Sequence, residues 1–154
     1  MKMEIIPVLH NVSSVQRLVD SVKTAYSLGA KTFVVTKAYG GAAQSGVAEA
    51  MRISLKLNKQ FIVLPDLDDV VELLHPDRIL LLTYDYSKDT IDLENMKELN
   101  GRILVVVSGS DPEFSSSELK LGEPVYFKDS PGKIGPIGEL ALILYTLARN
   151  GVSR

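Results

Sequence analysis

The sequence predicts an α/β fold whose mainly parallel sheet is covered by helices on both faces. Short apolar runs alternate with segments of helical periodicity, an order typical of strand–helix units. Runs such as Ile79–Leu82 are apolar at every position, which indicates strands buried on both faces. The 154 residues contain no repeat, linker or low-complexity tract, so we expect one domain covering residues 1–154.

The first half of the chain predicts three strand–helix units. Asn11 or Ser13 can cap the first helix, because a short side-chain oxygen accepts from first-turn amides, and Gly29 can end it. The third helix begins in an acidic cluster, which suits the positive end of a helix dipole, and ends near His75. The expected strands are 5–9, 31–35 and 61–64, the second helix is 42–57, and the acidic cluster is Asp66, Asp68 and Asp69.

The second half predicts three more strands and a strongly apolar final helix. The expected elements are strands 79–82, 103–107 and 125–127, a helix over about 92–99 and a polar loop through 115–117. A loop rich in glycine and proline then leads into a helix from Ile137. Leu142 and Tyr145 lie outside the main apolar stripe of that helix, so a second subunit is expected to cover it. We therefore predict a homodimer through the C-terminal helix.

The composition limits the class of protein. A hydrophobic fraction of 45% and a charged fraction of 23% exclude global disorder, and a net charge of −2 argues against indiscriminate nucleic-acid binding. The absence of cysteine excludes disulfides, thiolate metal sites and a cysteine nucleophile. The N-terminal apolar run is too short for a signal peptide, and no run approaches the ~18 residues of a membrane helix. We expect a soluble cytoplasmic protein.

Ligands of open parallel sheets bind at the carboxyl ends of the strands. The first three ends, at His10, Thr36 and Pro65-Asp66, look like ordinary caps and turns. The last three are rich in small, glycine or hydroxyl residues, so a ligand held mostly by backbone is expected there, although tight turns alone also explain them. These ends are Thr83-Tyr84-Asp85, Ser108-Gly109-Ser110 and Phe127-Lys128.

Other site chemistries find less support in the sequence. There is no P-loop, no GxGxxG after the first strand and no GxSxG elbow at Ser108. His10 and His75 lack metal-ligand spacing, and helix capping explains the acidic cluster better than a divalent ion does. A basic helix face could contact phosphates or simply be solvated surface. Its members are Arg52, Lys56 and Lys59, with Lys37 and Arg17 near the strand ends.

Three segments resemble the SPOUT superfamily of RNA methyltransferases, in particular its SpoU/TrmH-like branch. His10 to Gly29 resembles the N-terminal segment of that family, and Leu104 to Asp111 resembles its glycine-acid loop. Val125 to Ala148 resembles its last strand, knot loop and final helix. The individual matches are Asn11, Thr24, Ala25, Gly29, Gly109 and Asp111.

The resemblance implies a C-terminal deep trefoil knot, a homodimer and bent S-adenosylmethionine held by backbone of the knot loops. The expected function is a S-adenosylmethionine-dependent RNA methyltransferase acting on tRNA or rRNA, with the ribose 2′-hydroxyl as one target. No metal is implied. The cofactor-binding residues carried over by position are Thr83, Tyr84, Ser108, Gly109, Ser110, Val125, Tyr126, Phe127, Ile134, Gly135, Pro136 and Ile137.

The sequence departs from the family at its catalytic positions. The catalytic arginine falls at Lys23 and the preceding asparagine at Arg17, and these residues would bind phosphate or help deprotonate the nucleophile. Lys23 could equally form a surface ion pair with Asp20. Two alternatives therefore stay open. One is a non-catalytic RNA- or nucleotide-binding dimer that retains the fold, and the other is a nuclease-like hydrolase, which needs a metal site.

Overall fold

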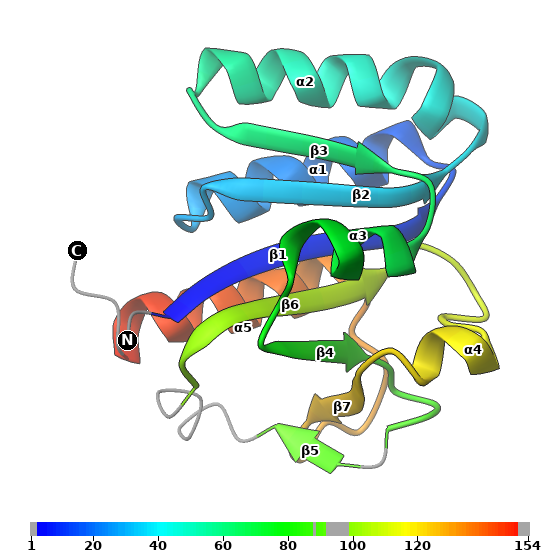
Figure 1. The fold of residues 1–154 in the computed structure, drawn as a ribbon, viewed down its shortest axis with the longest axis vertical. Coiled ribbons are helices and arrows are strands. Elements are labelled where there is room, and N and C mark those ends of the chain that lie inside the picture. The colour runs from blue at the N-terminus through cyan, green and yellow to red at the C-terminus, as the bar shows by residue number, and fades with distance from the viewer. Residues whose placement is uncertain (1–2, 88, 92–98, 151–154) are drawn as a thin grey trace.

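A computed structural model describes residues 3–87, 89–91 and 99–150 of the chain. The sheet has seven strands in the order β3-β2-β1-β6-β4-β7-β5, and every neighbouring pair is parallel (Figure 1). All carboxyl ends of the strands therefore meet at one edge of the sheet. The strands are β1 (Met3–Val12), β2 (Thr32–Ala38), β3 (Gln60–Leu64), β4 (Arg78–Leu82), β5 (Asp89–Ile91), β6 (Gly101–Ser108) and β7 (Glu123–Phe127).

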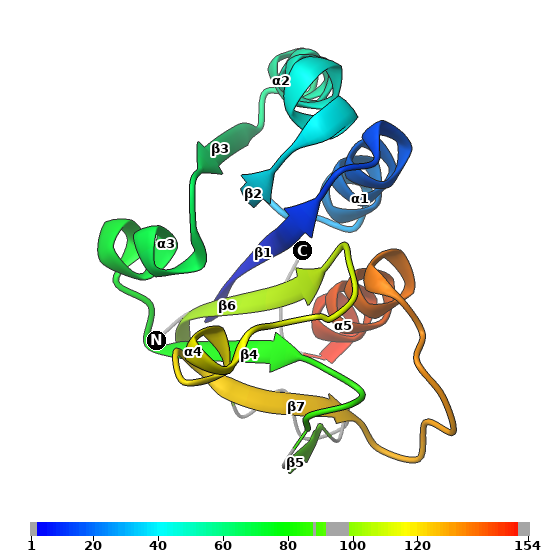
Figure 2. The same ribbon diagram turned by 90° about the vertical axis from the view of Figure 1, so that its right-hand side faces the viewer.

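Helices cover both faces of this sheet. Figure 2 shows α1, α2 and α5 on one face and α3 and α4 on the other. The helices are α1 (Val15–Ser27), a π-helical turn η1 (Ala42–Gly46) that continues into α2 (Val47–Lys56), α3 (Leu67–Leu74), α4 (Ser116–Leu119) and α5 (Pro136–Asn150). The predicted α/β architecture with a parallel sheet is confirmed.

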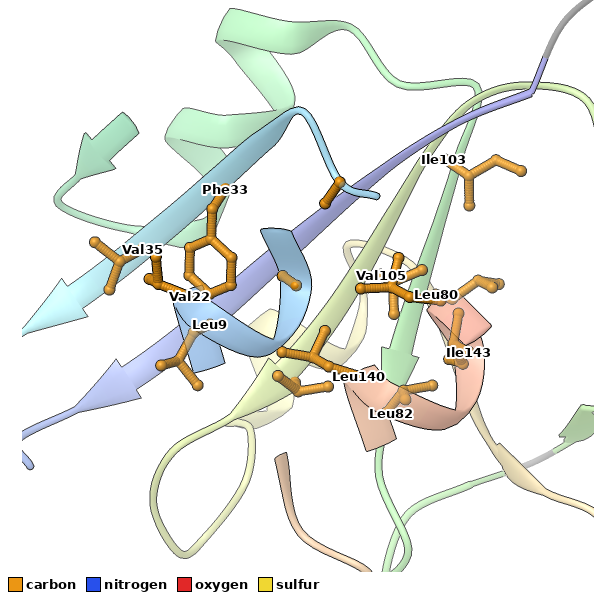
Figure 3. Packing of buried hydrophobic residues seen from close by; sticks show 14 of the residues in the cluster. Leu9, Val22, Phe33, Val35, Leu80, Leu82, Ile103, Val105, Leu140 and Ile143 are labelled. Atoms are coloured by element: carbon orange, nitrogen blue, oxygen red, sulfur yellow. The ribbon is translucent and has the colours of Figure 1, made fainter. Parts of the chain in front are cut away.

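The two faces bury separate hydrophobic cores because successive side chains of a strand point to opposite sides. Val105 packs with α1 and α5, and its neighbour Val106 packs with α3. Figure 3 shows the first core, in which Phe33 and Leu140 lie over the central strands. Strands β1 and β6 contribute side chains to both cores, which explains the continuous apolar runs in these two strands.

Local departures from the expected elements have simple causes. The cap of α1 is Ser14, whose hydroxyl accepts from the amide of Arg17 at 3.1 Å, because β1 extends through Asn11 to Val12. The expected loop at 115–117 contains the short helix α4, which begins with a capping box between Ser115 and Glu118. Strand β5 was not expected. The helix predicted over 92–99 lies almost wholly outside the described residues.

Helix α5 packs along α1 and the sheet through four buried residues, Leu140, Ile143, Leu144 and Leu147. Leu142 is 40% exposed and Tyr145 is 50% exposed, so apolar surface remains on the outer side of the helix. The homodimer through α5 stays a prediction. Within the described part of the chain, no helix has both the length and the apolar character that crossing a membrane requires.

Candidate functional site

An acidic pocket lies at the carboxyl edge of the sheet, between the start of α3 and the helix α4. It has a volume of about 260 Å³ and is lined by Asp66, Leu67, Asp68, Ser117, Glu118 and Leu121. These two short segments are 48 residues or more apart in the sequence, and they meet because α3 and α4 cover the same face (Figure 2). The pocket adjoins the first three strand ends, which sequence reasoning had treated as ordinary turns.

Three carboxylates gather at one side of this pocket. One oxygen from each of Asp66, Asp68 and Asp69 lies within 4.8 Å of the others. Asp66 and Asp69 also form the capping box of α3, in which the Asp66 amide donates to Asp69 Oδ2 at 2.9 Å. The predicted capping role is therefore confirmed. A carboxylate accepts several bonds, so capping leaves lone pairs for a further ligand.

Glu118 reaches the pocket from the opposite side and is held by two hydrogen bonds. Its Oε1 accepts from the amide of Ser115 at 2.8 Å, and its Oε2 lies 2.7 Å from Nε2 of His10. The other ring nitrogen of His10 lies 2.7 Å from the hydroxyl of Thr36. His10 is completely buried and its ring stacks on Phe114. A chain of side chains thus runs from β2 through β1 to the pocket.

The protonation states follow from burial and from these partners. Burial lowers the pKa of His10 below its ordinary value, and Glu118 opposes that change only in part. Burial alone would raise the pKa of Glu118, but the Ser115 amide and His10 together lower it below its ordinary value. These directions favour a carboxylate of Glu118 that accepts from Nε2–H of His10, with Thr36 donating to Nδ1.

Lys37 adds a cation to the same edge of the sheet. Its amide donates to the carbonyl of Pro65 at 2.9 Å, which fixes the end of β2 beside the residue that precedes Asp66. Its side chain is exposed, and its charge contributes to the lowered pKa of His10, after burial as the main cause. An exposed ammonium at this edge can contact an anionic substrate.

The residues predicted to bind a cofactor lie at the other half of the same edge. The Gly109 amide donates to the His10 carbonyl at 2.8 Å, and Arg17 Nη1 donates to the Gly109 carbonyl at 2.6 Å. Thr83, Ser108, Val125, Tyr126 and Phe127 are buried, Ser110 and Gly135 to Ile137 are half-buried, and Tyr84 and Ile134 are exposed. The structure therefore brings Arg17 and the three strand ends together, and their role in binding a cofactor stays a prediction.

Lys23 does not join this group. It lies two turns after Arg17 on α1, which runs back from the carboxyl edge, so it is about 9 Å further along the helix axis. Its side chain is exposed. Other basic residues singled out in the sequence also lie at two different edges of the sheet. Lys59 comes just before β3 and lines a pocket with Lys31 at the amino edge, whereas Lys37 and Arg17 follow strand ends at the carboxyl edge.

A second buried polar cluster connects the loop before α5 to the strand ends. Tyr126 donates to Glu139 Oε2 at 2.8 Å and accepts from the Ile134 amide at 2.6 Å. Thr83 donates to Glu113 Oε1 at 2.6 Å, and Lys133 Nζ lies 3.7 Å from the other Glu113 oxygen. Burial raises the pKa of Glu139 to about 7. One of these bonds engages the Ile134 amide, which belongs to the loop that was expected to hold a cofactor.

The fold places the chain in a known structural class. It superposes on the SpoU methyltransferase AviRb of Streptomyces viridochromogenes, solved with AdoMet, with a TM-score of 0.75 and 13% identity over 97% of this chain and 61% of that one. It also superposes on a probable methyltransferase of Bordetella pertussis with a TM-score of 0.72 and 12% identity over 94% of each chain. At such identities the likeness shows a shared fold and nothing about chemistry.

The sequence itself belongs to a different named family. A family model described as "RecB-family nuclease (DUF2122)" matches residues 40–146, and the chain is a member of that family. A protein of Aeropyrum pernix named "Putative type II restriction enzyme ApeKORF2002P" is 54% identical over 98% of this chain and 97% of its own length. MjaORF1200P of Methanocaldococcus jannaschii, named in the same way, is 32% identical over 92% of this chain and 94% of its own length.

These relatives contradict the predicted RNA methyltransferase. The predicted α/β architecture was right, but the function attached to it was wrong, because close relatives carry nuclease names while the methyltransferases are distant neighbours. The physical reason lies in the residues already noted. At the position of the catalytic arginine of SPOUT methyltransferases, this chain has Lys23. Where those proteins usually have polar residues before the last helix, it has Gly135, Pro136 and Ile137. A fold can persist after the side chains that performed its chemistry have changed.

Proposed function

We propose that the chain is a metal-dependent nuclease that hydrolyses phosphodiester bonds at the acidic pocket. The observation that carries this proposal is the convergence of Asp66, Asp68 and Glu118 on one open pocket at the carboxyl edge of the sheet. Membership of the nuclease family supports it. The nuclease-like alternative needs a metal site, and the three clustered aspartates, with Glu118 on the other side of the pocket, support one.

The donor set fits a hard divalent cation. Mg²⁺ and Ca²⁺ take oxygen ligands, and Mg²⁺ is commonly held by one or two carboxylates together with substrate phosphate. The oxygens of Asp66, Asp68 and Asp69 are within 4.8 Å of one another, close enough to share one ion. Asp66 and Asp68 are exposed, so water and a phosphate can reach them. Such an ion would lower the pKa of a bound water and polarise the phosphate.

The protein residues would divide the remaining work. Glu118 and the aspartates hold negative charge at a fixed place, and Glu118 keeps its orientation through Ser115 and His10. Lys37 would contact a phosphate oxygen of the nucleic acid and offset the charge that develops there. The substrate we propose is nucleic acid, either the DNA that the names of the relatives suggest or the RNA expected from the sequence.

Cleavage assays with matched variants test this function. Purified protein is incubated with supercoiled plasmid DNA and with a folded RNA transcript, in Mg²⁺, in Mn²⁺ and in EDTA. We expect metal-dependent cleavage of at least one substrate and a loss above about 100-fold in Asp66→Asn and Glu118→Gln, beyond the effect typical of outer-shell changes. Asparagine also caps helices well, so Asp66→Asn should fold.

Glu72→Gln is the control, because Glu72 is exposed on the same helix α3 and does not line the pocket. Cleavage that persists unchanged in Asp66→Asn and Glu118→Gln would point to a contaminating nuclease. An equal loss in Glu72→Gln would show that the loss is not specific to the pocket. Absence of cleavage with either metal and both substrates would refute the proposal. Titration with S-adenosylmethionine is run in parallel, because support for that cofactor rests only on the shared fold.

We also propose two features of the assembly. The trefoil knot is supported by the strand order, in which β6 lies between β1 and β4 although β4 precedes β6 in the sequence. The homodimer is supported by the exposed Leu142 on α5. Sedimentation analysis should give a dimer that Leu142→Glu converts to monomer. A monomeric wild-type protein would contradict the dimer.

A further inference from the structure

We propose that His10 is a positioning residue that holds the side chain of Glu118 in place beside the acidic pocket. This inference rests on the proposed function, since it concerns a residue of the same site. His10 itself is completely buried and does not line the pocket. It acts through Glu118, whose Oε2 lies 2.7 Å from its Nε2.

The need for such a residue comes from the helix that carries Glu118. Helix α4 has only 4 residues and none of them is buried. Its own capping box fixes Oε1 of Glu118 against the Ser115 amide and does nothing for the other oxygen. A helix this short has little stability of its own. A bond to the sheet is what can hold the carboxylate in a reproducible place.

His10 provides a rigid anchor for that bond. It lies near the end of β1, paired in register with Thr36 on β2 and Ser108 on β6. Its ring stacks on Phe114, with centroids 5.9 Å apart, and Thr36 Oγ1 is 2.7 Å from Nδ1. Both ring nitrogens and one ring face are thus engaged. A side chain fixed on three sides can transmit the order of the central sheet to α4.

The direction of the hydrogen bonds follows from the charges around the ring. The groups that act on His10 are Glu118 from α4, Lys37 from β2 and Asp66 at the start of α3. Thr36 is placed to donate to Nδ1, which leaves Nε2 with the proton and Glu118 as the acceptor. Carboxylates that bind metals are themselves commonly hydrogen-bonded in this way, and loss of that partner costs 10–100-fold in metal affinity or activity.

Nitrogen-15 NMR of the wild-type protein gives the first test. The ring nitrogens of His10 should show the neutral Nε2–H tautomer between pH 6 and 8, because only that tautomer donates to Glu118. A neutral Nδ1–H tautomer would overturn the inference, and it would do so without any variant whose folding could be questioned.

Variants give the second test. His10→Phe keeps the stacking on Phe114 but cannot donate, whereas His10→Gln can still donate to Glu118. We expect Mn²⁺ affinity, measured calorimetrically, to fall 10–100-fold in His10→Phe and to recover within about threefold of wild type in His10→Gln.

The outcomes separate this inference from the proposed function. A wild-type protein that binds no Mn²⁺ would refute the metal site, while the tautomer of His10 would still decide whether His10 donates to Glu118. A folded His10→Phe protein with wild-type Mn²⁺ affinity would refute the positioning role. If His10→Phe does not fold, the tautomer observed in the wild type decides.

Discussion

Replacing Glu139 by glutamine should change how the stability of the protein depends on pH. Glu139 is 2% exposed and accepts a hydrogen bond from Tyr126 at 2.8 Å. Burial raises its pKa from an ordinary value of 4.5 to about 7. The folded protein therefore binds a proton more tightly at this site than the unfolded chain does, and folding favours the protonated carboxyl.

The sign and size of the effect follow from that difference. The stability associated with the protonated carboxyl is fully present below about pH 4.5 and is lost as the pH rises to about 7. Each tenfold difference in proton affinity is worth about 1.4 kcal/mol, so the total is on the order of 3 kcal/mol. Glutamine cannot ionise, but its carbonyl can still accept from Tyr126. Glu139→Gln should therefore not show this loss.

Urea unfolding of both proteins at several pH values from 4.5 to 8 measures the effect. The free energy of unfolding of the wild type relative to Glu139→Gln should decrease by about 3 kcal/mol across this range. Titrations elsewhere in the chain cancel in the comparison, provided that they are far from the substituted site. Parallel pH profiles for the two proteins would refute the assignment of a buried, proton-binding Glu139.

Two further substitutions test the packing. A Cβ on Gly109 would lie 3.0 Å from both the Asn11 carbonyl oxygen and Val12 Cβ, so Gly109→Ala should cost about 1–3 kcal/mol in thermal or urea unfolding. Gly132→Ala is the matched control, since a Cβ there meets nothing within 4 Å; equal losses in the two variants would contradict the close approach. Phe33→Ala should cost about 3–5 kcal/mol, because Phe33 is completely buried in the larger core; a loss below about 1 kcal/mol would contradict that placement.

The sequence was most informative where one physical rule acts locally. Apolar runs without alternation predicted β1, β4 and β6, because a strand that is covered on both faces has apolar side chains on both of its faces. The acidic start of α3 was predicted because carboxylates favour that end of a helix, and the structure contains the capping box. Short elements were missed. Strand β5 and helix α4 are too short for a periodic pattern to develop.

The candidate site could be predicted only in pieces. Asp66, Asp68 and Asp69 lie within four consecutive residues, and their cluster was noticed, but capping was preferred to a divalent ion. Glu118 comes from a loop-like segment and contacts His10, 108 residues away, through the tertiary fold. The S-x-x-E spacing from Ser115 to Glu118 was the one available sign that a helix begins after Ser115. No local rule connects that helix to the acidic cluster.

The functional error has a related origin. Degenerate motifs such as those near Gly109 and before α5 report backbone geometry, which is what the SpoU-like neighbours share with this chain. Reaction chemistry depends on a few side chains, and the sequence had already shown that those had changed at Lys23 and at Gly135 to Ile137. These replacements, rather than the shared fold, bear on which reaction the chain can carry out.

The central claim is that the acidic pocket binds a divalent cation. Titration of nitrogen-15-labelled protein with substoichiometric Mn²⁺ tests it directly, because the paramagnetic ion broadens amide resonances close to its binding site. We predict selective broadening at residues 66–69 and 115–118, abolished by Glu118→Gln together with Asp68→Asn. Broadening centred on the strand ends at 83–85 and 108–110, or no selective broadening at all, would contradict the account.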